Sequence, residues 1–315
     1  MENQMSVTPH GIHHVTAIAG DPQRNVDFYT KVFGLRLVKQ TVNFDAPHIW
    51  HLYYGDEHGS PASILTFFPW PGVTPGREGS GLTTATSFSV PATSLGFWSK
   101  HLAGLNIDWA WGKDSAGHDL IEVRDYDGMR LQLVGTVGDI RSGWDGVANI
   151  PAEHAVRGLH SVELSQIQID PTAGMLQNLL GMSLSSETSG RANFQMAEGA
   201  SGAKVEVLGG VGDRGLQAGG TVHHVAFRAP DLTTMELWQQ ELMNQGVAVT
   251  EIKDRQYFKS IYFREPGGVL FEIATDDPGF EIDEPLLELG KKLKLPPWLE
   301  PSRDQIQQTL TEISV

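Results

Sequence analysis

Hydrophobic and polar residues along the chain follow a pattern that returns four times. The two clearest copies share the tripeptide His-His-Val, at residues 13–15 and 223–225, each inside a short β-branched run. Each run is followed by an Asp-containing turn and a segment with apolar residues at helical spacing, and then by three short runs of β-branched and aromatic residues. The repeated unit is therefore predicted to be one strand, one helix and three further strands.

Two fainter copies of this unit lie between the clear ones and open at residues 81 and 158. Self-similarity of this kind is typical of a fold built from duplicated modules. We predict an α+β fold of four βαβββ modules that pair into two barrels, with the first and fourth modules enclosing a site. The four modules are predicted to cover residues 9–70, 81–137, 156–209 and 219–276.

The same pattern predicts two halves and a tail. The N-terminal half spans residues 9–137 and the C-terminal half spans residues 156–276, with a linker at 135–155. The tail, residues 277–315, is interrupted by prolines. Within it, Ser302 followed by Gln305 predicts a capping box at the start of a final helix.

The composition of the 315 residues removes several classes of function. Without cysteine the chain cannot form disulfides, thiolate metal sites or iron–sulfur clusters. Its 23 basic and 38 acidic side chains give a net charge of −15, the wrong sign for a nucleic-acid-binding protein. No apolar run approaches the roughly 20 residues that cross a bilayer, and the polar start of the chain, residues 1–9, predicts a cytoplasmic protein. The 12 histidines remain the main candidates for chemistry near neutral pH.

The first strands of the four modules can be aligned with one another, and so can the last strands. Each strand then contributes one residue at an equivalent position. The eight positions are His14 and Thr66, Thr84 and Gln132, Ser161 and Glu206, and His224 and Glu272. The modules that pack together decide what a site at these positions contains. If the third module packs against the fourth, the site contains one histidine, two glutamates and a serine. If the first module packs against the second, the site contains a single histidine.

The first module with the fourth gives His14, His224 and Glu272, with Thr66 as a weak fourth member. Two neutral imidazoles and one carboxylate leave coordination positions open, as in non-haem Fe(II) enzymes. A structural zinc site would instead close all four positions, often with cysteine. We therefore expect the two-histidine, one-carboxylate set. Because side chains alternate along a strand, His13 and His14 are not expected to enter one pocket together.

Two further groups of residues are interpreted as structural. Glu206 is in register with Glu272 but is paired with Ser161, so we expect no metal site there. An aromatic and histidine cluster on the third strand of the first module comprises His48, Trp50, His51 and Tyr54. These residues could line the substrate pocket, but core packing is the favoured interpretation.

Six segments carry motifs that are specific when taken together: GIHHVT at 11–16, FGLRLVKQTVN at 33–43, HLYYGD at 51–56, TFFPW at 66–70, FREPGGVLFEIAT at 263–275 and LPPWLEP at 295–301. With the four modules, they resemble the vicinal oxygen chelate superfamily, which includes glyoxalase I, fosfomycin-resistance enzymes, bleomycin-binding proteins and extradiol ring-cleaving dioxygenases. More narrowly, the chain is similar to the hydroquinone 1,2-dioxygenase group and to bacterial ring-cleaving dioxygenases of quinone-stress operons. The resemblance covers nearly the whole chain.

The resemblance implies a metal and its ligands. Fe(II), with Mn(II) as a compatible substitute, would be held by His14, His224 and Glu272. The implied reaction is the ring cleavage of a hydroquinone- or catechol-type diol by dioxygen. No nucleic-acid or membrane partner is implied, and a homo-oligomer is compatible with the resemblance.

The resemblance also implies residues that act beside the metal. The family has an arginine and a tyrosine seven residues apart near the metal, and Arg255 and Tyr262 match them as catalytic residues. His13, Thr16 and His223 match positions that support the ligands and the substrate.

Three alternative functions belong to the same superfamily. A glyoxalase-like isomerase would normally use four protein ligands, and Thr66 at the fourth position argues against it. A fosfomycin-type transferase is about one domain long and builds its site from two subunits, which a chain of four modules does not require. A non-catalytic sequestering protein would need an aromatic cleft without a metal, which the two histidines in register argue against.

Overall fold

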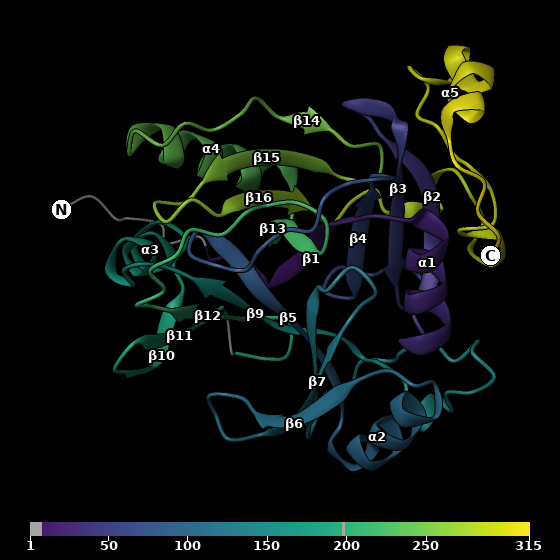
Figure 1. Cartoon of the computed structure of the whole chain (residues 1–315). Coiled ribbons are helices and arrows are strands. Elements are labelled where there is room, and N and C mark those ends of the chain that lie inside the picture. The colour runs from purple at the N-terminus through teal and green to yellow at the C-terminus, as the bar shows by residue number, and fades with distance from the viewer. Residues whose placement is uncertain (1–7, 197–198) are drawn as a thin grey trace.

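The structure is a computed structural model that describes residues 8–196 and 199–315. Within these residues the strands form two mixed eight-stranded sheets, one above the other in Figure 1. Each of the four predicted modules contains a strand, a helix and three strands in that order, which confirms the predicted fold class. Most of the polar segment on which the cytoplasmic prediction rested, residues 1–7, lies outside the described residues.

The first sheet is built from modules 1 and 4. Module 1 consists of β1 (Ile12–Ala19), α1 (Pro22–Asp27), the π-helical turn η1 (Phe28–Val32), β2 (Arg36–Asn43), β3 (Ala46–Gly55) and β4 (Ile64–Pro69). Module 4 consists of β13 (Thr221–Ala229), α4 (Leu232–Asn244), β14 (Lys253–Asp254), β15 (Lys259–Arg264) and β16 (Leu270–Thr275). Helices α1 and α4 begin in the same way, because Asp21 and Asp231 each accept a hydrogen bond from a backbone N–H of the first turn.

The second sheet is built from modules 2 and 3. Module 2 consists of β5 (Leu82–Pro91), the turn η2 (Ala92–Ser94), α2 (Leu95–Gly104), β6 (Trp109–Lys113), β7 (Asp119–Arg124) and β8 (Arg130–Thr136). Module 3 consists of β9 (Gly158–Ser165), α3 (Asp170–Gly174), the π-helical turn η4 (Met175–Leu179), β10 (Ser183–Thr188), β11 (Arg191–Gln195) and β12 (Lys204–Leu208). The linker between the modules contains the short turn η3 (Ala152–His154).

The first strands of the modules pair in the middle of each sheet. The strand order is β14-β15-β16-β13-β1-β4-β3-β2 in one sheet and β10-β11-β12-β9-β5-β8-β7-β6 in the other. Each sheet therefore takes one module from residues 9–137 and one from 156–276. These two halves describe the order of the chain and not two units with separate sheets.

Alternation along the central strands separates an apolar face from a polar one. In β1, Val15 and Ala17 belong to a large apolar cluster that also includes Phe88 and Leu131 of the second sheet. Burying such side chains contributes about 1.5–3 kcal/mol for each large one, so this shared core holds the two sheets together. The opposite face of β1 carries His14 and Thr16, and it is left for a polar site.

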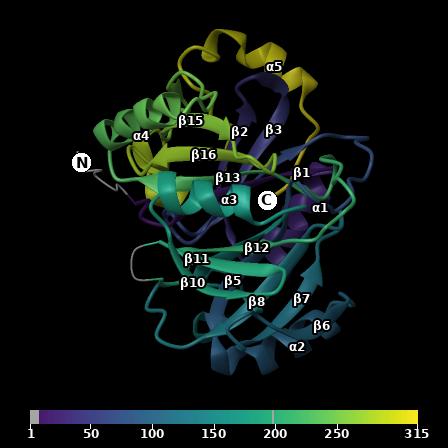
Figure 2. The same ribbon diagram turned by 90° about the vertical axis from the view of Figure 1, so that its left-hand side faces the viewer.

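The tail lies against the outer strands of module 1, beside β2 and β3 (Figures 1 and 2). Lys39 of β2 is fully buried, and its Nζ donates to the Phe280 carbonyl at 3.1 Å. The same ammonium pairs with Asp283 at 2.6 Å and with Glu284 at 2.5 Å. A buried cation with two carboxylate partners therefore anchors the tail to the sheet.

A helix follows at the predicted place, α5 (Arg303–Thr309), but the capping box is wrong. Ser302 makes no capping hydrogen bond, because it ends the turn η7 (Glu300–Ser302) with φ −104° and ψ 12° instead of the extended backbone of a typical N-cap. Two further turns, η5 (Phe280–Ile282) and η6 (Leu286–Glu288), precede it. Among the described residues, no helix has both the length and the apolar character to cross a membrane.

Replacing Lys39 with methionine tests the anchor. Lys39→Met keeps most of the side-chain volume but leaves the Asp283 and Glu284 carboxylates without their cation. Breaking a buried ion pair costs about 3–5 kcal/mol, and we expect the free energy of unfolding in urea to fall by that amount. Lys291→Met is the matched control, because Lys291 and its partner Glu288 are 57% and 48% exposed. Equal losses of stability in the two variants would contradict the anchor.

Candidate metal centre and active-site cavity

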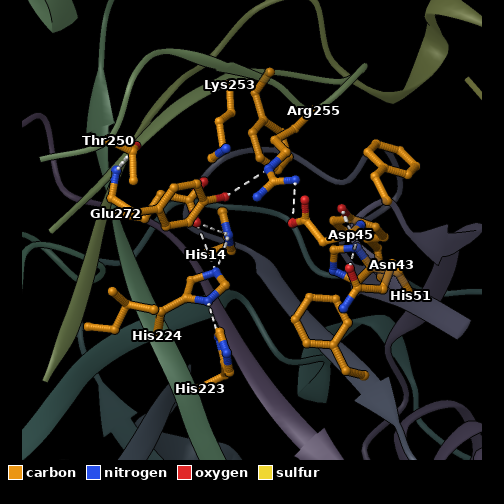
Figure 3. A pocket seen from close by; sticks show the side chains of 16 residues that line it. His14, Asn43, Asp45, His51, His223, His224, Thr250, Lys253, Arg255 and Glu272 are labelled. Atoms are coloured by element: carbon orange, nitrogen blue, oxygen red, sulfur yellow. Dashed lines mark hydrogen bonds and ion pairs between the residues drawn. The ribbon is translucent and has the colours of Figure 1, made fainter. Parts of the chain in front are cut away.

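Three side chains from adjacent strands converge at the centre of the first sheet (Figure 3). His14 comes from β1, His224 from β13 and Glu272 from β16. In the register, Thr16 lies opposite His224 and Ala226 lies beside Glu272. The Nε2 atoms of His14 and His224 are 3.4 Å apart, and Glu272 Oε2 is 3.3 Å from the first and 2.8 Å from the second. The fold therefore brings together the three residues predicted to bind a metal.

Each of the two converging histidines is oriented by the histidine before it. His13 Nδ1 lies 2.9 Å from His14 Nδ1, and His223 Nδ1 lies 2.7 Å from His224 Nδ1. One nitrogen of each contact must carry the proton. If the Nδ1 atoms of His14 and His224 carry it, their Nε2 lone pairs point at the carboxylate, the usual arrangement of metal-binding histidines.

The two histidine pairs differ in the cavities that their side chains line. His14 lines the central cavity while His13 lines a separate one, but His223 and His224 both line the central cavity. His13 and His223 are each passed over by a register shift of the β1–β13 pair, which falls between Ile12 and His14 in one case and opposite His224 and Val222 in the other. A bulge of this kind redirects a side chain to the other face.

The three converging groups fit a divalent cation. Glu272 is fully buried, and its Oε2 has no hydrogen-bond donor apart from the imidazoles. Such a buried carboxylate requires a positive charge beside it. Burial raises the pKa of Glu272, but the neighbouring His14 and His224 imidazoles outweigh this effect and hold the pKa well below its ordinary value. A divalent cation would supply the same charge when both imidazoles are neutral, and nitrogen with carboxylate ligands suits first-row metals.

The candidate metal centre opens into a cavity of about 320 Å³. Its walls combine aromatic rings with a few polar groups, which is typical of a site for a small aromatic molecule. The aromatic part is made of Phe44, His51, Tyr53, Phe68, Phe258 and Tyr262. The polar part away from the metal centre is made of Asn43, Asp45, Thr250, Lys253 and Arg255, several of which are labelled in Figure 3.

Tyr262 and Arg255, the residues predicted to be catalytic, lie together beside Glu272 at the edge of the candidate metal centre. Tyr262 is directly opposite Glu272 in the β15–β16 pair, so both side chains reach the same face. Arg255 Nε donates to Tyr262 Oη at 3.1 Å, and Arg255 Nη1 donates to Asp45 Oδ2 at 3.0 Å. Burial and the Glu272 carboxylate raise the pKa of Tyr262 above its ordinary value, although Arg255 opposes this. Tyr262 is therefore a neutral hydroxyl at the cavity.

His51 belongs to the cavity wall, so the expectation that it packs in the core is wrong. Its Nε2 lies 2.7 Å from Thr66 Oγ1, and its Nδ1 lies 2.9 Å from Tyr53 Oη. Thr66 in turn donates to Thr16 Oγ1 at 3.0 Å. Burial lowers the pKa of His51 well below its ordinary value, so the ring is neutral. The Thr66 hydroxyl, the weak fourth member of the predicted set, is thus already part of a hydrogen-bond chain.

The other members of that aromatic cluster have separate positions. Tyr54 lies in the core as expected, and its hydroxyl donates to Asn25 Oδ1 at 2.9 Å. Trp50 donates from Nε1 to the Thr311 carbonyl at 2.8 Å, and so contacts the tail. His48 is exposed.

The second sheet has no equivalent site in the part of the chain that the structure describes, where the three converging groups are the only such cluster. Glu206 contacts the guanidinium of Arg191. The nearby Glu163 accepts from Arg130 at 2.9 Å. Arginine side chains neutralise these carboxylates.

The family model described as the glyoxalase/bleomycin resistance protein/dioxygenase superfamily matches residues 11–133 and 158–273. The chain belongs to this superfamily. It is 42% identical to the protein named "Putative ring-cleaving dioxygenase MhqO" of Bacillus subtilis, with 97% of each chain covered. It is 32% identical to the chlorohydroquinone/hydroquinone 1,2-dioxygenase of Sphingobium indicum, with 96% of each chain covered.

Two solved structures share the fold of this chain. A crystal structure titled as a "putative dioxygenase" from Bacillus subtilis superimposes with a TM-score of 0.93 at 40% identity, with 98% of both chains covered. Glyoxalase I of Zea mays superimposes with a TM-score of 0.62 at 15% identity, over 84% of this chain and 92% of that one. The second likeness is one of fold only.

Sequence reasoning did not find Asp45, Lys253 or Ser260. Ser260 donates to Glu272 Oε1. The sequence could have indicated this residue, because it lies two residues before Tyr262 and therefore on the same face of the strand. Asp45 lies at the tip of the β2–β3 hairpin, and Lys253 lies in a strand of two residues. Their places beside the cavity follow from how modules 1 and 4 pack, which local sequence does not reveal.

Metal-dependent stabilisation tests the converging triad. A cation that binds only the folded protein raises its stability by about 2.7 kcal/mol at a concentration 100 times its Kd. We expect anaerobic Fe(II) to raise the Tm of metal-stripped protein, and His224→Ala to lose this increase. His48→Ala, which removes an exposed histidine, is the control and should keep it. A full increase in His224→Ala would show that the triad is not where the metal binds.

Proposed function

We propose that this protein is a metal-dependent dioxygenase that cleaves the aromatic ring of a hydroquinone- or catechol-type diol. The observation that carries the proposal is a buried set of two imidazoles and one carboxylate at the end of an aromatic-walled cavity. Three protein ligands leave coordination positions for both a diol and dioxygen. The relative from Sphingobium indicum, whose name states hydroquinone as its substrate, makes this class of diol the first candidate.

Fe(II) is the proposed cofactor, with Mn(II) as the alternative, and His14, His224 and Glu272 would hold it. When bound, the metal supplies a positive charge that favours the ionised form of a diol oxygen and a centre that reacts with dioxygen. Both atoms of dioxygen enter the product as one carbon–carbon bond of the ring breaks. The role of His13 and His223 is to fix the orientation of the two imidazole ligands through their Nδ1 contacts.

Tyr262 and Arg255 are proposed as the catalytic residues beside the metal. The neutral Tyr262 hydroxyl would donate a hydrogen bond to the diol oxygen or relay its proton, and Arg255 would stabilise the negative charge that develops. Thr16 supports the cavity wall, because it accepts the last hydrogen bond of the chain from His51 through Thr66. Three further parts of the proposal rest on the family resemblance. The cleavage would be of the extradiol type, the protein would remove quinone-forming diols in the cytoplasm, and it would form a homo-oligomer.

Oxygen uptake after anaerobic reconstitution with Fe(II) tests the proposed reaction. The substrates are hydroquinones and catechols, with and without charged ring substituents, and the adduct of methylglyoxal with a thiol. We expect consumption of one dioxygen per ring with diols and no turnover of the adduct. Turnover of the adduct, with no oxygen uptake on any diol, would assign a glyoxalase-like isomerase instead. Binding of diols with no turnover at all would indicate a sequestering protein.

Removing one hydroxyl tests the role of Tyr262. Tyr262→Phe keeps the ring and the three metal-binding residues, so we expect the metal content to stay at the wild-type level. Because general acid–base groups contribute about 100- to 10,000-fold, kcat should fall within that range. Tyr126→Phe, at an exposed tyrosine outside the cavity, is the control. A wild-type kcat in Tyr262→Phe would remove this residue from the mechanism.

A further inference from the structure

Two cationic side chains line the same edge of the active-site cavity. Lys253 and Arg255 are two residues apart along an extended segment, so both reach the cavity face, and Figure 3 shows them side by side there. Asp254 between them points away and pairs with Lys259 at 3.0 Å. In a chain with a net charge of −15, this edge of the cavity is a local exception.

Arg255 and Lys253 differ in how strongly other groups of the protein pair with them. Arg255 is held by Asp45 at 3.0 Å and by the Tyr262 hydroxyl at 3.1 Å. Lys253 has one ion-pair contact, with Glu251 at 3.4 Å, and that carboxylate is 82% exposed. An ion pair so open to water contributes little. The Lys253 side chain is itself 33% exposed, so its stem is covered while its ammonium is available to a ligand in the cavity.

With a divalent metal bound, the cavity would carry more positive charge than a simple diol neutralises. Lys253 and Arg255 are balanced by Asp45 and Glu272 among the lining residues, whereas a divalent metal would add two positive charges. The His14 and His224 imidazoles add none, because metal ligands must be neutral. A diol that binds as a single phenolate removes only one positive charge. The charge that remains is poorly screened in a partly enclosed cavity, where interactions are stronger than in water.

We propose that the substrate carries an anionic ring substituent, of the carboxylate class, and that Lys253 is the residue that recognises it. The inference rests on the proposed function, because it assumes a diol bound at the metal centre. Lys253 would pair with the carboxylate while the diol oxygens face His14, His224 and Glu272. Arg255 is less suited to this role, because its Nε donates to Tyr262 and its Nη1 pairs with Asp45.

Matched acid and amide substrates test the role of Lys253. Gentisate and protocatechuate carry a carboxylate beside a para- and an ortho-diol, and their amides have nearly the same shape without the charge. Steady-state oxygen uptake gives kcat/KM for each acid and its amide, and anaerobic titration of the Fe(II)-loaded protein gives the two Kd values without turnover. We expect wild-type protein to prefer at least one acid over its amide by about tenfold, as hydrogen bonds to charged groups commonly provide.

Substitutions at Lys253 should change this preference specifically. Lys253→Met should abolish the tenfold ratio, and Lys253→Arg should restore most of it. Lys259→Met is the control, because Lys259 pairs with Asp254 away from the cavity lining, and its ratio should stay at the wild-type value. High salt should reduce the ratio in wild-type protein, since screening weakens an exposed charge pair.

The outcomes separate this inference from the proposed function. Oxygen uptake on uncharged diols, with equal or weaker use of the acids by wild-type protein, would overturn the role of Lys253 and leave the dioxygenase proposal standing. A tenfold ratio that persists in Lys253→Met would overturn it as well. Absence of oxygen uptake with every diol would overturn the proposed function itself, whereas the anaerobic Kd ratio would still report on recognition by Lys253.

Discussion

The site depends on one interaction, the antiparallel pairing of β1 with β13 at the centre of the first sheet. This pairing brings two histidines that are 210 positions apart in the sequence to an Nε2–Nε2 distance of 3.4 Å. The parallel neighbour β16 adds the Glu272 carboxylate on the same face. A cluster of this kind is costly to bury without a cation. The large apolar core on the opposite face therefore supports a polar centre that could not be stable alone.

Of the two sheets that the duplicated modules form, only the first brings two histidines and a carboxylate together among the described residues. In the second sheet, β5 pairs with β9 as β1 pairs with β13, so the backbone offers an equivalent central position. There the carboxylates of Glu163 and Glu206 are neutralised by arginines instead of facing histidines. The same backbone geometry thus gives an ion-pair cluster in one sheet and a candidate metal centre in the other, and a few side chains decide between them.

Much of the fold and the triad could be predicted because both depend on repetition. Four copies of one strand and helix pattern indicated the modules, and the register of His14, His224 and Glu272 followed from aligning them. His51 could not be placed in the same way, because a half-buried histidine on a strand has the same local signal whether it faces a core or a cavity. Asp45 and Lys253 come from different modules, so only the approach of the two ends of the first sheet, where Arg255 pairs with Asp45, brings them to one cavity. The capping box at Ser302 failed because the preceding turn fixed its backbone.

Anomalous X-ray scattering from crystals prepared anaerobically with Fe(II) tests the central claim most directly. The account predicts one strong peak at the iron absorption edge, within about 2.0–2.2 Å of the Nε2 atoms of His14 and His224 and of a Glu272 oxygen, the range usual for nitrogen and carboxylate ligands. An iron peak bound elsewhere, with none between these three side chains, would contradict it.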